Sequence, residues 1–193
     1  MTSRLTLSLV AALAMIAPAA VYAQAVDPAA ATVDSFNDAL IATMKTGGSV
    51  SARLRKVEPA VDRAFDLTVM TRTAVGPAWT GFSAADQASL VKAFGRFTAA
   101  TYAKNFDSFS GESFTVDPKV ETRGVDKIVK SALVPKSGSP TNFIYRLRGG
   151  KIVDVFYNGT VSQVAAQRSQ FAGVTNGAVL AKQLNDKADA LLK

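Results

Sequence analysis

The tetrapeptide Ser89-Leu90-Val91-Lys92 matches a known catalytic motif in residue type and spacing. An S-x-x-K motif places a serine nucleophile one helical turn before a lysine in penicillin-recognising enzymes, and Lys136-Ser137-Gly138 is similar to the K-T-G element of those enzymes. Their S-x-N element should follow the nucleophile, whereas the nearby tripeptide Ser35-Phe36-Asn37 precedes it. The order of the motifs therefore disfavours a serine hydrolase, which we keep as an alternative.

The 193-residue chain contains no cysteine and no histidine, which excludes many kinds of catalytic and metal-binding site. Their absence removes disulfides, thiolate nucleophiles, Ser–His–Asp triads and the usual ligands of zinc and haem. Carboxylate pairs at helical spacing, Asp62/Asp66 and Asp186/Asp189, lie in polar contexts with lysine or arginine nearby, which is typical of solvated faces. No glycine-rich phosphate-binding motif is present. We therefore expect a binding protein rather than an enzyme, with no cofactor and no metal.

The N-terminal segment has the pattern of a secretory signal. Arg4 precedes an apolar run from Leu5 to Ala17, and Val21-Tyr22-Ala23 has the small-x-small spacing of a cleavage site. The run is shorter than the roughly 20 residues that a membrane-spanning helix needs. We predict a signal peptide over residues 1–23 and a single soluble domain over residues 24–193. Export without disulfides indicates a bacterial periplasm.

Positive charge is concentrated in one part of the chain. Segment 119–151 holds eight of the 22 lysines and arginines but only two of the 15 acidic residues. Such a field favours anionic partners, either lipid headgroups or an acidic protein, while export argues against nucleic acid. A solvated sheet face is the alternative. The candidate residues for docking to a partner or a membrane are Lys130, Arg146 and Arg148.

Helical periodicity dominates both ends of the expected domain. Asp27-Pro28 reads as an N-cap followed by a proline in the first turn, and Ser83 to Asp86 has capping-box spacing. Apolar residues at helical spacing predict helices over 28–46, 51–65, 66–76, 83–105, from about 160 to 170, and 176–192.

Between residues 111 and 158 the apolar period changes to two, which predicts half-buried strands. Phe143, Tyr145 and Leu147 alternate with polar residues, and Gly149-Gly150 is placed to close a hairpin with the next strand. Helices, then an antiparallel sheet, then helices predict an α+β domain. The apolar face of this sheet could either enclose a cavity for an apolar ligand or fill a core.

Six stretches of the sequence together resemble the toluene-tolerance family, the periplasmic lipid-binding components of Mla-type transport systems. They are Phe65-Asp66-Leu67-Thr68-Val69-Met70, Val75-Gly76-Pro77-Ala78-Trp79, Thr101-Tyr102, Tyr145-Arg146-Leu147-Arg148, Asp154-Val155 and Arg168-Ser169-Gln170-Phe171. Within the family, the chain looks most like the hopanoid-biosynthesis-associated branch. It departs from the family at Gly150-Lys151, where an aromatic residue is often found, and at Gln167, where a tyrosine is common.

The resemblance implies a twisted antiparallel sheet packed against several helices, similar to the nuclear transport factor 2 fold, around an apolar pocket. It implies a monomeric carrier that binds a phospholipid or a hopanoid and shuttles it between an inner-membrane transporter complex and the outer membrane. No hydrolysis is implied. The alternative is a periplasmic adaptor with a filled core that uses the sheet only for protein docking.

Two groups of residues complete the prediction. We expect Arg168 to face the core and therefore to need an anionic partner, such as Asp154, that anchors a helix to the sheet. The residues expected to line the lipid pocket are Met70, Trp79, Phe97, Phe143, Tyr145, Leu147, Val153, Val155 and Tyr157.

Overall fold

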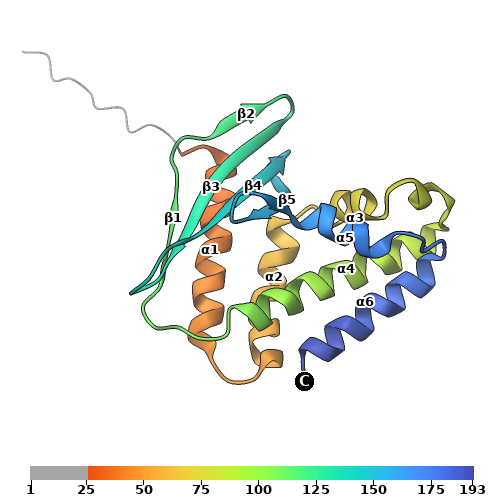
Figure 1. Ribbon diagram of the computed structural model, residues 1–193, viewed down its shortest axis with the longest axis horizontal. Helices are drawn as coiled ribbons and strands as arrows, with labels where there is room; N and C mark the ends of the chain where they lie inside the picture. Colours follow the sequence, from red (N-terminus) through yellow and green to blue (C-terminus); the bar gives the residue numbers. More distant parts are fainter. Residues whose placement is uncertain (1–25) are drawn as a thin grey trace, which may run out of the picture.

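A computed structural model describes residues 26–193, so the predicted signal peptide lies outside the described residues. Helices come first in the chain, strands follow, and two helices close it, which confirms the predicted α+β class (Figure 1). The elements are α1 (Pro28–Thr46), α2 (Val50–Ala64), α3 (Leu67–Val75), the 3-10 helix η1 (Gly76–Gly81), α4 (Ala84–Asn105), β1 (Ser113–Val116), β2 (Glu121–Arg123), β3 (Asp126–Val134), β4 (Thr141–Arg148), β5 (Lys151–Tyr157), β6 (Val161–Ser162), α5 (Gln163–Phe171) and α6 (Gly177–Leu191). No helix in the described part is long and apolar enough to cross a bilayer.

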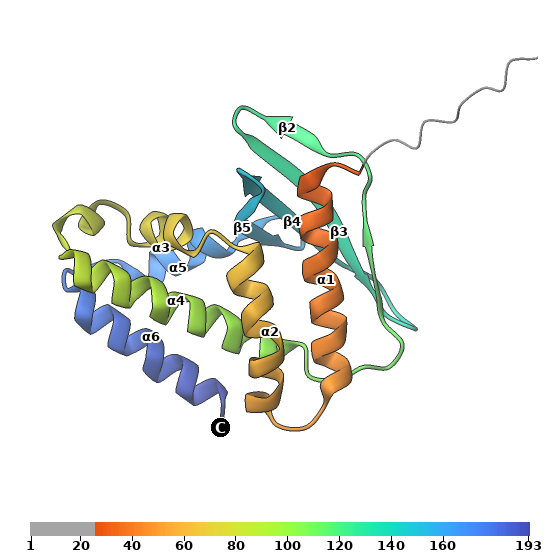
Figure 2. The same cartoon turned by 180° about the vertical axis from the view of Figure 1, so that it is seen from behind.

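The strands form one antiparallel sheet in the order β1-β3-β4-β5-β6, and β2 also pairs with β3. The turn at Gly149-Gly150 closes the β4–β5 hairpin, as predicted, and both glycines have positive φ angles. Helix α1 runs along one face of this sheet, and α4 and α6 lie side by side (Figures 1 and 2).

Side-chain caps explain where the α-helices begin. Asp27 Oδ1 accepts a hydrogen bond from Ala29 N at 2.9 Å, and Ser83 Oγ accepts one from Asp86 N at 3.1 Å. The N-cap residues whose side chains bond a backbone N–H of the first turn are Asp27, Ser49, Asp66, Ser83, Ser162 and Asn176.

An aromatic cluster occupies the core between the sheet and the first helices. Phe36 of α1 contacts Phe65 edge-on, with ring centroids 4.9 Å apart, and contacts Tyr102 of α4 in the same way at 5.1 Å. The ring of Tyr145 of β4 also meets that of Phe36 edge-on, with centroids 6.5 Å apart. Phe36 therefore joins α1, α4 and the sheet in one packed unit.

Three local features do not follow from the sequence analysis. Residues 77–81, which lie between two of the predicted helices, form part of η1, which buries Trp79. Helix α2 runs unbroken from Val50 to Ala64 although it contains Pro59, a residue that usually kinks or ends a helix. Strands β2 and β6 were not predicted, since runs of three and two residues are too short to show a period of two.

Candidate ligand-binding cavity

A cavity of about 660 Å³ lies between α4, the sheet and α5. Helix α4 forms its longest wall, because Phe94, Phe97, Thr101 and Asn105 recur at intervals of three and four residues and so share one face of the helix. From Phe94 to Asn105 the helix axis rises roughly 16 Å. The cavity is therefore long as well as large.

The wall opposite α4 is apolar. Leu133, Phe143, Val155 and Tyr157 line it from three neighbouring strands, and the ring of Phe143 meets the ring of Tyr157 edge-on at 5.7 Å. Met70 of α3 closes the side nearest the core. Side chains of this kind exclude water from an apolar ligand.

Polar but uncharged groups lie between the apolar ones. Gln163 and Gln167 of α5, Thr98 and Thr101 of α4, and Thr141 of β4 all line the cavity. The Thr101 hydroxyl donates a hydrogen bond to the Phe97 carbonyl oxygen at 2.8 Å. Gln167 Oε1 is buried and has no hydrogen-bond partner among the described residues.

None of the described residues that line the cavity is an aspartate, glutamate, lysine or arginine. Burial raises the pKa of Tyr102, which lines the cavity, and of Tyr145 beneath it, so both phenols stay neutral. The Tyr145 hydroxyl donates to Asn37 Oδ1 at 3.4 Å, and Asn37 Nδ2 donates to Ser131 Oγ at 3.0 Å. An apolar chain with an uncharged polar group fits such a wall, whereas a buried phosphate would have no cation to bind.

The structure brings five of the nine predicted pocket residues to the cavity and leaves four away from it. Those at the cavity are Met70, Phe97, Phe143, Val155 and Tyr157. Trp79 is buried in η1, while Tyr145 and Leu147 point to the helix-covered face of the sheet but are completely buried in the core.

Val153 is the fourth residue away from the cavity, and a β-bulge explains its position. Strand register shifts between Arg146 and Leu147, so that Arg146 pairs with Asp154 but Leu147 pairs with Ile152. The extra residue is Val153, and Ile152 joins the main core in its place. Strict alternation along β5 therefore does not hold at Val153, which is buried outside the main core.

Most of the cavity wall was not predicted from the sequence, because the residues predicted for the pocket lie mainly on the strands. The helical period of α4 would have indicated the lining residues on that helix, but no apolar pattern marks Gln163 and Gln167 of α5. The missed lining residues are Phe65, Phe94, Thr98, Thr101, Tyr102, Asn105, Phe106, Leu133, Thr141, Gln163 and Gln167.

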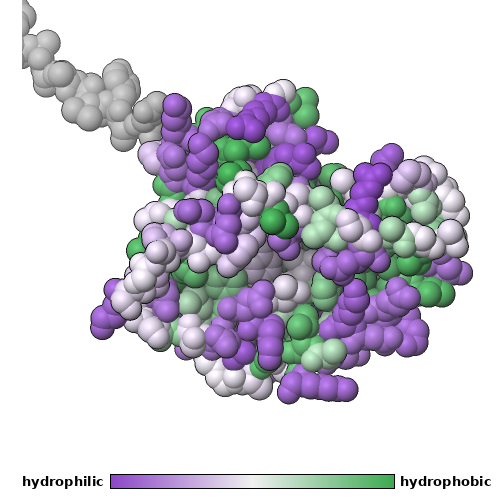
Figure 3. All heavy atoms as spheres, viewed as in Figure 1, coloured by the Kyte–Doolittle hydropathy of each residue, from purple (hydrophilic) through white to green (hydrophobic). Residues whose placement is uncertain are grey.

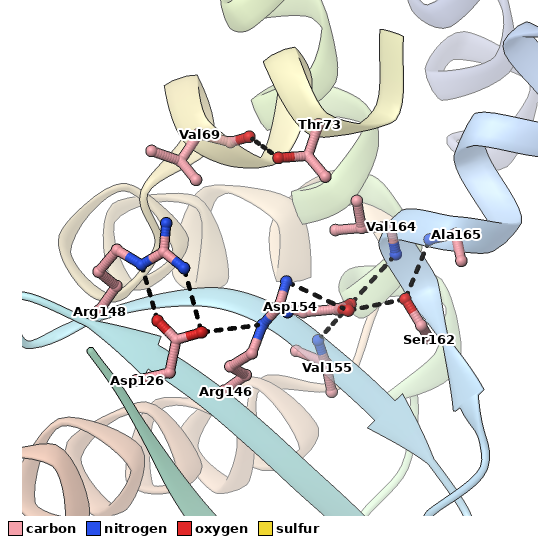
Figure 4. A network of polar contacts seen from close by, with 10 residues as sticks. All are labelled: Val69, Thr73, Asp126, Arg146, Arg148, Asp154, Val155, Ser162, Val164 and Ala165. Atoms are coloured by element: carbon pink, nitrogen blue, oxygen red, sulfur yellow. Dashed lines mark hydrogen bonds and ion pairs between the residues drawn. The ribbon is translucent and has the colours of Figure 1, made fainter. Parts of the chain in front are cut away.

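Asp154 positions α5, which carries the cavity residues Gln163 and Gln167. Its carboxylate accepts hydrogen bonds from Val155 N at 2.9 Å, from Val164 N at 3.2 Å and from Ser162 Oγ at 2.7 Å (Figure 4). Ser162 in turn accepts from Ala165 N at 3.0 Å. A carboxylate at the N-terminus of a helix is also favoured by the helix dipole, so Asp154 fixes the start of α5 on the sheet.

Arg146 and Arg148 of β4 lie beside carboxylates (Figure 4). Arg148 binds Asp126 through two hydrogen bonds of 2.7 and 3.1 Å, which lower the pKa of Asp126. Arg146 lies 3.9 Å from both Asp126 and Asp154, and its Nε has no hydrogen-bond partner in the described part of the chain. Lys130 Nζ lies 2.6 Å from a Glu121 oxygen. The three candidate docking residues therefore all have an anionic neighbour within the domain.

The expected pair between Arg168 and Asp154 is wrong. Arg168 is exposed on α5, and its guanidinium lies against Gly76, where a Cβ would stand 3.2 Å from Nη2. Within residues 26–193 the cation near Asp154 is Arg146. Arg168 does not face the core, so the argument that it needs a buried partner does not apply.

The S-x-x-K residues do not form a site in this fold. Ser89 and Lys92 are exposed on α4, outside the cavity wall, and Lys136-Ser137-Gly138 lies in the turn between β3 and β4. In addition, no group of three or more acidic side chains that could hold a metal ion occurs in the described part.

A long, uncharged cavity between an antiparallel sheet and helices is typical of a domain that encloses an amphipathic small molecule. The family model described as MlaC protein matches residues 32–186, and the chain belongs to the MlaC family. This confirms the resemblance to Mla-type lipid-binding proteins, while the hopanoid-associated branch stays a prediction.

A solved protein structure has a similar fold. A phospholipid-binding protein from Ralstonia solanacearum, solved in complex with a phospholipid, superposes with a TM-score of 0.73 at 22% sequence identity. The match covers 86% of this chain and 99% of the Ralstonia chain. No curated protein matches the sequence.

Proposed function

We propose that the chain is a periplasmic lipid carrier that holds the acyl part of a phospholipid in the cavity between α4, the sheet and α5. The observation that carries the proposal is the uncharged 660 Å³ cavity, whose lining places Phe97, Phe143 and Val155 around a long apolar space. Membership of the MlaC family and the lipid-bound Ralstonia neighbour support it.

The physical need for such a cavity follows from the insolubility of acyl chains. Exposing a chain to water costs about 0.8 kcal/mol per methylene group, or on the order of 12 kcal/mol for sixteen carbons. A carrier removes this cost by enclosing the chain, and it needs no catalytic group to do so. We propose that it works as a monomer and exchanges lipid with an inner-membrane transporter and the outer membrane after export by the segment 1–23.

Docking through the basic segment is part of this proposal. Lys130, Arg146 and Arg148 lie beside carboxylates, but Lys119 and Lys136 are exposed without an ion pair among the described residues. Hydrophilic side chains gather over the end of the sheet near β2 (Figure 3). The positive charge of Lys119 and Lys136 would speed encounter with anionic surfaces and would make transfer rates depend on salt.

Transfer between vesicles tests the carrier function. Donor vesicles hold a fluorescent phospholipid with a quencher, and acceptor vesicles are unlabelled, so that transfer restores fluorescence. We expect the chain to accelerate transfer, and we expect Phe97→Asp to abolish the acceleration because it places a carboxylate in the cavity. Ser89→Asp is the matched control, since it adds the same group to an exposed position of α4.

Two results would decide against a carrier. Transfer that is no faster with the chain than without it would favour a docking adaptor. Hydrolysed lipid that appears with the wild-type chain but not with Ser89→Asp would favour the serine hydrolase.

A further inference from the structure

The exposed residues of the cavity wall mark where the cavity opens to the surface. Of the residues that line it, only Asn105, Tyr157 and Gln163 are exposed. Asn105 is the last residue of α4, Tyr157 is the last of β5, and Gln163 is the first of α5. The ends of these three elements therefore border the opening, which we call the mouth, and none of the three side chains is charged.

An apolar row of side chains runs from inside the cavity to the edge of the sheet. Phe143 of β4 lies opposite Tyr157 of β5, and Tyr157 lies opposite Val161 of β6. Residues directly opposite each other in antiparallel strands have their side chains on the same face of the sheet. Exposure rises along this row, from 7% at Phe143 to 47% at Tyr157 and 52% at Val161. The apolar lining of the cavity thus continues onto the surface, and we call the pair Tyr157 and Val161 the lip.

The lip differs from the other exposed apolar side chains. Within residues 26–193, six large hydrophobic side chains are exposed, and of these only Tyr157 and Val161 pair directly across two strands. Apolar groups that adjoin one another in water gain free energy when another apolar surface covers them. The lip therefore favours contact with an apolar partner.

The chemistry of the mouth favours a lipid bilayer as this partner. A tyrosine ring has an apolar body and a polar tip, and this combination is typical of the boundary between a membrane and water. The amides of Asn105 and Gln163 can bind headgroups by hydrogen bonds, and neither brings a charge that must lose its water. A lipid that passed between bilayer and cavity at such a contact would not expose its acyl chains to water.

We propose that the lip docks in the headgroup region of a bilayer and holds the mouth against the membrane while a lipid enters or leaves. The proposal rests on the lipid-carrier function and adds the surface through which the carrier meets the membrane. Because Tyr157 and Val161 are uncharged, this contact is independent of salt, unlike the attraction of Lys119 and Lys136 to anionic surfaces.

Tryptophan fluorescence tests the contact directly. The single native tryptophan, Trp79, is buried and does not line the cavity, so an added tryptophan can be followed against the wild-type signal. The emission of Val161→Trp should shift to shorter wavelength when phosphatidylcholine vesicles are added, and phosphatidylcholine with brominated acyl chains should quench it. Val179→Trp is the matched control, because Val179 is 49% exposed on α6 and no residue of α6 lines the cavity. Its emission should not change.

Lipid transfer between phosphatidylcholine vesicles tests what the contact does. Val161→Glu should slow transfer about tenfold, because it removes an apolar contact and places a charge at the membrane surface. Val179→Glu should transfer at the wild-type rate, and the ratio between the two variants should be the same at low and high salt. Native mass spectrometry should find as much bound lipid in Val161→Glu as in the wild-type chain.

Three results would overturn docking by the lip. They are emission of Val161→Trp that vesicles leave unchanged, wild-type transfer by Val161→Glu, and slowed transfer by Val161→Glu only where the vesicles contain a transporter protein. The third result would assign the lip to a protein partner. A wild-type chain that transfers no lipid overturns the carrier function instead, and the fluorescence of Val161→Trp then decides on membrane contact separately, because it needs no bound lipid.

Discussion

The guanidinium of Arg168 on α5 lies against Gly76 at the end of α3, so close that a Cβ on Gly76 would stand 3.2 Å from Nη2. Gly76 is the C-cap of α3, and a cation near the carboxyl end of a helix is favoured by the helix dipole. The contact holds α5 against α3, and both helices carry residues that line the cavity.

Gly76→Ala should destabilise the fold and loosen α5. Gly76 has φ 71° and ψ −140°, a conformation that an alanine adopts at a cost of about 1–3 kcal/mol, and the new Cβ would also displace Arg168. Gly47→Ala is a close control, because Gly47 caps α1 with φ 60° and ψ −156° but has no neighbour within 4 Å of the added Cβ.

Urea denaturation measures the cost of backbone strain, and hydrogen exchange measures whether α5 is loosened. Both variants should lose similar stability through backbone strain, but only Gly76→Ala should increase hydrogen exchange in α5. Equal protection of α5 in the two variants would show that the Arg168 contact does not position this helix.

Stability should be insensitive to pH between about 5 and 8 and should fall below about pH 4. The chain has no histidine, so no side chain with an ordinary pKa titrates in the upper range. Lys130 and Arg123 hold the pKa of Glu121 at about 2, and Arg148 lowers the pKa of Asp126. A lowered carboxyl pKa stabilises the folded state above the ordinary pKa, and this contribution is lost as the pH falls towards the lower value.

Thermal unfolding at a series of pH values checks this expectation. Asp126→Asn should lower the melting temperature at pH 7 and should flatten the decline in stability below pH 4, since one of the titrating groups is removed. A melting temperature that falls between pH 8 and pH 5 would contradict the assignment.

The helices and their starts could be predicted closely from the sequence, because caps and apolar periods are local signals. Asp27 and Pro28 begin α1 at the predicted residue, and Gly149-Gly150 closes the predicted hairpin. The bulge at Val153 was not predictable in this way, since an extra residue in a strand leaves no mark on the composition.

The candidate site was harder to predict than the fold. Apolar alternation does not distinguish a residue that faces a cavity from one that fills the core, so Phe143 and Tyr145 received the same prediction although only Phe143 lines the cavity. Gln167 belongs to a short helix without an amphipathic pattern, so its place in the cavity wall follows only from where Asp154 fixes that helix.

The substitution Leu147→Ala tests whether Leu147 belongs to the core or to the lipid-binding cavity. Leu147 is completely buried and does not line the cavity, so its truncation should cost about 2–5 kcal/mol of stability while the folded fraction still binds lipid normally. Urea denaturation and displacement of a fluorescent fatty acid measure the two properties. Lost lipid affinity in the folded variant would place Leu147 in the binding site after all.

Native mass spectrometry of the chain purified from the periplasm of a bacterial host tests the lipid-carrier function most directly. We expect a main species heavier than the polypeptide by the mass of one lipid, together with a Phe97→Asp variant that is folded and shows the polypeptide mass alone. A wild-type spectrum with only the polypeptide mass, or a Phe97→Asp variant that retains the lipid at the wild-type level, would contradict the lipid-carrier function.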